Sequence, residues 1–159
     1  MTPGVARGAS ADEGSALIEF VGASVILLIP LLYLLLMVFD VQRSSFAVTQ
    51  AAREAGRAFA TAPSSDAGLE RARFAAQVAF GDQGISDAAE VSFRPAGSGC
   101  DSNESVNPRL TPGATYTVCV VREVPLPYAD KGFLHRAVPA RVRVVGRYAL
   151  AVDRFREAA

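Results

Sequence analysis

Residues that bind metals or act as nucleophilic catalysts are scarce in this chain. It has one histidine, His135, and two cysteines, Cys100 and Cys119. These three residues supply too few soft ligands for a metal site. His135 also has no serine, cysteine or aspartate signature beside it, so we interpret it as a structural residue. The shortage favours a protein that is not an enzyme and that needs no metal or cofactor.

An excess of either charge is also missing. The 16 Lys and Arg residues balance the 16 Asp and Glu residues, so nothing indicates a nucleic-acid partner or an acidic substrate. The glycine-rich stretch Gly97-Ser98-Gly99 has no strand before it and no GK[ST] after it, and it therefore does not predict a phosphate-binding loop. We expect no nucleic acid and no small-molecule substrate among the partners.

Charge is almost absent from one long segment. Residues 15–39 read SALIEFVGASVILLIPLLYLLLMVF, and Glu19 is their only charged residue. A membrane-spanning helix needs about 20 mostly apolar residues, which residues 20–39 supply. Summed over the run, insertion is favoured by about 5–9 kcal/mol, against about 2.5–3.5 kcal/mol for a charge at mid-helix. Membrane helices tolerate a proline such as Pro30, usually with a kink.

Two other kinds of apolar N-terminal segment need to be considered. A cleaved secretory signal has an apolar core of about 7–15 residues after a basic start. Here the apolar run is longer, and Arg7 is offset by Asp12 and Glu13, so this interpretation is disfavoured. A plain uncleaved anchor, in which Glu19 reaches toward the membrane surface, stays open as the main alternative.

Glu19 is the residue in this segment that most needs an explanation. An ionisable group within a membrane-spanning run is costly and usually functional. Gly14 lies five positions before Glu19, and Phe20 follows it directly. This spacing resembles the processing site of type IV pilin-like precursors. In such precursors the leader is cut after the glycine, and the glutamate becomes the fifth residue of the mature chain.

A longer stretch carries a more specific resemblance. The segments EGSALIEF, VGASVILLIPLLYLLLMVFD and QAAREAGRAFA are similar to the TadE-like family. Members of that family are minor pilins or pseudopilins of tight-adherence (Flp-type) pilus systems. The resemblance covers roughly residues 13–60 and is most specific in its first part. Ser15 stands where major pilins usually have phenylalanine, a departure that suits TadE-like proteins better than major pilins.

The resemblance implies a set of roles and partners. A membrane aspartyl prepilin peptidase would cut between Gly14 and Ser15. Glu19, beside Phe20, would serve assembly, with its carboxylate paired to the α-ammonium of a neighbouring subunit. The implied partners are other pilins or pseudopilins and pilus platform proteins, in cell adhesion or secretion. The alternative function is a bitopic, membrane-anchored extracytoplasmic binding module.

The same resemblance predicts how the chain is placed across the membrane. We expect a leader at 1–14, a transmembrane helix at 15–39, a stem helix at 40–62 and an extracytoplasmic domain at 63–159. The processing site requires a cytoplasmic N-terminus, which makes the protein a single-pass protein of the cell membrane or of the pilus. Three arginines that follow the span favour the opposite orientation by the positive-inside rule, and the processing site outweighs them: Arg43, Arg53 and Arg57.

Beyond the span the periodicity predicts an α+β fold. The stem helix carries an alanine-rich stripe, and two partners for it stay open: other helices or the chain's own domain. Asp66 is expected to cap a second helix at 67–80. A period of two then predicts strands of a small antiparallel sheet at 90–94, 115–124 and 140–152.

Two features of the strands bear on function. Cys100 and Cys119 are an even pair in a segment expected outside the cytoplasm, which favours one disulfide over two reduced buried thiols. The last strand places Arg141, Arg143 and Arg147 on one face. Lipid headgroups or a partner pilin are possible contacts for this row, but we interpret it as a solvated strand face.

Overall fold

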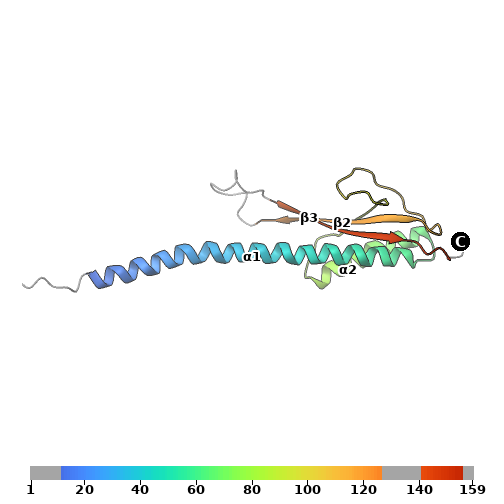
Figure 1. Ribbon diagram of the computed structural model, residues 1–159. Coiled ribbons are helices and arrows are strands. Elements are labelled where there is room, and N and C mark those ends of the chain that lie inside the picture. The colour runs from blue at the N-terminus through green and yellow to red at the C-terminus, as the bar shows by residue number, and fades with distance from the viewer. Residues whose placement is uncertain (1–11, 127–140, 156–159) are drawn as a thin grey trace, which may run out of the picture. The chain divides into compact units, whose positions relative to one another are not determined.

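The computed structural model describes residues 12–126 and 141–155, with side chains from residue 16 onward. It has the α+β architecture expected from the sequence (Figure 1). The predicted strands agree with the structure to within one residue at each described end. His135 lies outside the described residues. The elements are α1 (Asp12–Ala60), α2 (Ser65–Asp82), β1 (Glu90–Pro95), β2 (Thr115–Pro125) and β3 (Arg141–Ala151).

The chain divides into two units, Met1–Val38 and Phe39–Ala159. In the first unit the described residues belong to α1, and the helix continues through Pro30. This helix is long and apolar enough to cross a membrane, and its most apolar 18-residue window has no residue buried by protein. Large apolar side chains such as Ile26 are 76% exposed. A surface of this kind is stable in lipid rather than in water.

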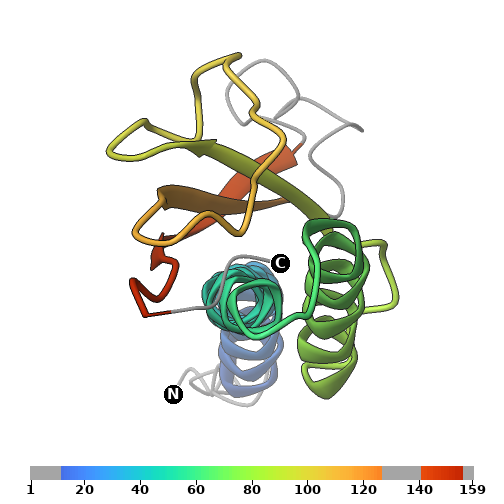
Figure 2. The same cartoon turned by 90° about the vertical axis from the view of Figure 1, so that its right-hand side faces the viewer.

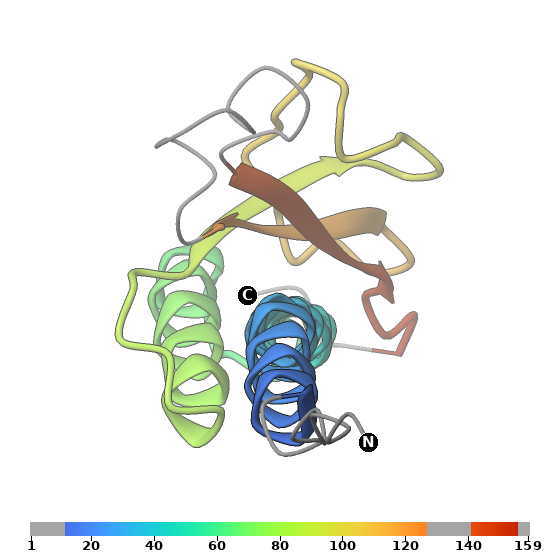
Figure 3. The same cartoon turned by 90° about the vertical axis from the view of Figure 1, so that its left-hand side faces the viewer.

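The second unit packs two helices against one sheet. The strands are antiparallel in the order β1-β2-β3. Figures 2 and 3 show α2 and the later part of α1 side by side on the same face of the sheet. Phe59 of α1 lies at the centre of the core, with its ring centroid 4.9 Å from that of Phe93 and 6.5 Å from that of Tyr116.

The alanine-rich stripe of α1 is buried by the chain's own domain. This burial decides between the two partners that the sequence left open. Small side chains let α2 and the sheet approach the helix closely, because every methylene left out of the interface shortens the distance between backbones. The fully buried members of the stripe are Ala47, Val48, Ala51, Ala52, Ala55 and Phe59.

Glycines mark the points of closest approach. A Cβ added to Gly146 of β3 would lie 1.9 Å from the Val48 carbonyl oxygen, so the strand passes directly over the α1 backbone. About two turns further along α1, a Cβ on Gly56 would lie 2.6 Å from the Tyr148 ring. β3 and α1 therefore come closest at two glycines, Gly146 of the strand and Gly56 of the helix.

The start of α2 corrects one prediction. Ser64, not Asp66, is the N-cap: its backbone is extended, and its hydroxyl accepts a hydrogen bond from the Ala67 amide at 3.3 Å. The helix begins two residues earlier than predicted. Serine and aspartate are equally good N-caps, so local preference alone does not separate Ser64 from Asp66. Asp66 instead lies in the first turn, where its negative charge interacts favourably with the positive end of the helix dipole. α1 also ends at Ala60, two residues before the predicted end.

The disulfide predicted from the sequence is present. Cys100 and Cys119 are bonded across a sequence separation of 19 residues. The bond ties the loop after β1 to the face of β2 that points away from the helices. Cys119 is fully buried, as are Val118 and Val120 on the opposite face of the strand. The loop thus gives the central strand a second covered face.

The contact between Gly146 and Val48 predicts a position that tolerates no side chain. We expect Gly146→Ala to lower the free energy of unfolding by about 1–3 kcal/mol and Gly146→Val to lower it further, because the strand must move away from the helix. Thermal and denaturant unfolding of the full-length protein in detergent measures this. Gly99→Ala is the matched control: a Cβ there meets nothing within 4 Å. Unchanged stability of Gly146→Ala would contradict the close contact.

The disulfide predicts both stability and compartment. Replacing Cys119 with Ala should lower the free energy of unfolding by about 3 kcal/mol for a loop of this length. Because the bond persists only outside a reducing cytoplasm, both cysteines of the native protein should resist alkylation at cell lysis until a reductant is added. Peptide mapping of the alkylated protein measures this. Labelling of both thiols without reductant would show that the domain lies on the cytoplasmic side.

Candidate functional site

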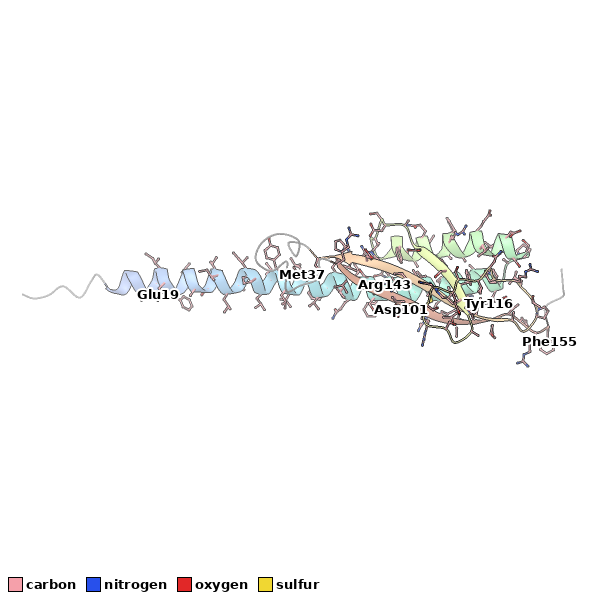
Figure 4. The ribbon with its side chains drawn as sticks, turned by 90° about the horizontal axis from the view of Figure 1, so that it is seen from above. Glu19, Met37, Asp101, Tyr116, Arg143 and Phe155 are labelled. Carbon is pink, nitrogen blue, oxygen red and sulfur yellow. A yellow bond between two sulfur atoms is a disulfide. The ribbon has the colours of Figure 1, made fainter. Side chains whose placement is uncertain are left out.

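Glu19 lies on the apolar part of α1, and its side chain is exposed in the described chain. Figure 4 shows it projecting from the side of the helix. The ion pairs found in the described residues all lie in the second unit, and none includes Glu19. Its neighbours Ile18 and Phe20 are 74% and 72% exposed. In lipid this carboxylate would therefore need a counter-charge from elsewhere.

Gly14 and Ser15 lie in the first turn of α1, which begins at Asp12. The first four amides of a helix have no intrahelical acceptor, and glycine costs about 1 kcal/mol relative to alanine in a helix. The bond between Gly14 and Ser15 therefore lies in a turn that unwinds at low cost.

The arginine row on β3 is largely neutralised within the domain. Arg141 pairs with Glu123 at 3.0 Å, and Arg143 pairs with Asp101 at 2.7 Å. These side chains are between 47% and 84% exposed, so each pair stabilises the fold by less than about 1 kcal/mol. Arg147 is exposed and has no ion pair with a described residue. The row thus behaves as the solvated strand face that the alternation predicts.

A polar network that sequence reasoning missed lies nearer the start of the domain. The Arg122 guanidinium donates two hydrogen bonds to Asp87 Oδ2, at 3.0 and 3.2 Å, and a third to Ser44 Oγ. Arg122 is only 10% exposed, whereas Asp87 is 58% exposed. The contacts connect β2 to α1 and to the segment before β1. The only signal in the sequence is an arginine that directly follows the apolar run of its strand.

Across residues 12–126 and 141–155, no group of three or more His, Cys, Asp or Glu residues is placed to hold a metal ion. The functional candidates are therefore the glycine and glutamate of α1 and the surfaces of the disulfide-bonded domain. Comparisons with protein-family models, with curated proteins and with solved structures find no match to this chain.

Proposed function

We propose that this chain is a TadE-like minor pilin or pseudopilin that takes part in assembling a tight-adherence pilus or a related type IV-like secretion machine. The observation that carries the proposal is Glu19, a carboxylate without a described counter-charge in a helix able to span a membrane. Gly14, five positions earlier, supplies the matching processing signal. An inert anchor has no use for either residue.

Processing would create a counter-charge for the Glu19 carboxylate. Cleavage after Gly14 frees an α-ammonium on Ser15, and in an assembly this group can approach Glu19 of the adjacent subunit. Two unit charges 4 Å apart attract by about 4 kcal/mol at an effective dielectric constant of 20. The attraction disfavours separated subunits, because each would carry an unpaired charge in lipid. The pair would therefore act in assembly rather than in cleavage chemistry.

The construction of α1 also suits an assembly subunit. The same helix supplies the apolar segment of the first unit and, from residue 39 onward, the buried stripe of the second. Val48 and Phe59 of this stripe are fully buried, so the domain cannot release α1 without exposing its core. The helix that carries Glu19 thus also supplies part of the core of the second unit.

The proposal predicts a mature chain that begins at Ser15. In cells that contain a prepilin peptidase, mass spectrometry of the membrane-extracted protein should find Ser15 as the N-terminal residue. Gly14→Val should abolish cleavage, because the branched side chain does not fit where glycine is required. The matched control is Gly22→Ala, on the same helix, where an added Cβ meets nothing within 4 Å.

Native protein that keeps Met1 or Thr2 as its N-terminus would exclude processing and favour the bitopic anchored binding module.

The proposal also predicts that Glu19→Ala separates insertion from assembly. Insertion should be unchanged or improved, because a charge is removed from an apolar helix, and resistance to carbonate extraction measures it. Incorporation into the sheared pilus fraction should fall at least tenfold, with cleavage intact. Glu54→Ala, an exposed acid further along α1, is the matched control and should assemble normally. Normal assembly of Glu19→Ala would refute the assembly role of this carboxylate.

A further inference from the structure

A polar cleft lies on the face of the sheet that points away from the helices. Its volume is about 610 Å³, within the range of small-ligand sites. One wall is the outer face of β1 and β2, and the other includes Asn103 and Ser105 of the loop that the disulfide holds. The lining residues are Glu90, Ser92, Arg94, Asn103, Ser105, Val121, Glu123 and Arg143.

The roof of this cleft is fixed to the sheet at three points. Cys100 is bonded to Cys119. Arg143 pairs with Asp101 at 2.7 Å, and both are labelled in Figure 4. The Arg94 Nη1 group donates a hydrogen bond to the Ser102 carbonyl oxygen. With both the strands and the roof restrained, the cleft is preformed and a ligand would bind without ordering the loop.

Unpaired charges of opposite sign lie at the two ends of the β1 wall. Arg94 forms no ion pair with a described residue: its Nη1 donates to a backbone carbonyl, and its buried Nε has no acceptor among the described residues. Glu90 is exposed and forms no ion pair with a described residue. The two residues share a face of β1 four positions apart, which is about 13 Å at ~3.3 Å per residue. The other two charged lining residues already have partners outside the cleft, namely Glu123 with Arg141 and Arg143 with Asp101.

This arrangement selects the chemistry of a ligand. The carboxylates of Glu90 and Glu123 would repel a simple anion, and the guanidinium of Arg94 would repel a simple cation. A molecule with a carboxylate at one end and an ammonium at the other satisfies both ends. Between them Ser92, Asn103 and Ser105 offer hydroxyl and amide groups that suit peptide bonds. Val121 is the one apolar side chain in the lining, so large apolar ligands are disfavoured.

We propose that the cleft binds a short zwitterionic peptide of two or three residues, with its terminal carboxylate on Arg94 and its α-ammonium on Glu90. An extended peptide of this size measures about 7–10 Å at ~3.3 Å per residue. A charge-assisted contact of about 2.8 Å at each end brings the total to about 13–16 Å, so the two-residue peptide matches the backbone spacing of about 13 Å and the three-residue peptide needs the long Arg94 side chain to extend outward. The site makes the outer domain a peptide receptor in addition to any role in assembly.

The test measures binding of dialanine and trialanine to the full-length protein in lipid nanodiscs by isothermal titration calorimetry. We expect the free peptides to bind with a dissociation constant of about 1 mM or less. N-acetylation or C-amidation should each weaken binding about tenfold, because each removes one terminal charge. The proposal is overturned if neither free peptide binds, or if the capped peptides bind as well as the free ones.

Variants then assign the two ends. Arg94→Met should weaken the free peptide about tenfold and the C-amidated peptide little, whereas Arg94→Lys should restore part of the affinity. Because Arg94 also holds the roof, Glu90→Gln supplies an independent arm: it should weaken the free peptide and leave the N-acetylated peptide unaffected. Arg147→Met, on the same sheet face but outside the cleft, and Glu104→Gln, in the loop, are the matched controls. Equal losses in the control variants would refute the assignment.

Discussion

The rest of the second unit depends on the contact between the backbone of β3 and the backbone of α1. Gly146 allows the strand to lie against the Val48 carbonyl oxygen, and β2 and β1 follow β3 through the antiparallel register. Because the sheet is this close, Phe59 can touch both Phe93 and Tyr116. A small domain has little apolar surface to bury, so tight approach of backbones supplies dispersion contacts that a looser sandwich would lack.

The outer face of the sheet is covered by a different means. Among the described residues no helix lies on that face in Figures 2 and 3, and the loop between β1 and β2 covers it instead. A long loop with few apolar residues needs a covalent tie to stay in place, which the bond between Cys100 and Cys119 supplies. The loop is anchored at points rather than packed along its length. That kind of attachment leaves a polar cleft between loop and strands where a helix would have left none.

The two units place opposite demands on one helix. Residues 16–38 of α1 expose apolar side chains with no protein over them, whereas residues after Phe39 bury small ones. A proposed assembly signal, Glu19, lies in the first part, and the proposed peptide cleft belongs to the second. The proposed assembly role depends on where a charge lies within lipid. The proposed ligand binding depends on a rigid polar surface. The two proposed functions can therefore change independently of each other.

Local pattern determined much of this protein. The apolar run, the alternation of the strands and the even cysteine count depend on neighbouring residues or on composition, and the helices, the strands and the disulfide follow from them. The proposed roles of Glu19 and Gly14 rest on their spacing in the sequence and stay predictions. Tertiary structure decided the rest. It buried the alanine stripe of α1 in the chain's own domain, made Ser64 the cap of α2, paired Arg122 with Asp87 and placed Arg94 and Glu90 in one cleft. Each of these outcomes depends on contacts between residues distant in sequence or on a choice between competing local signals. A single sequence shows neither the distances between such residues nor which local signal prevails.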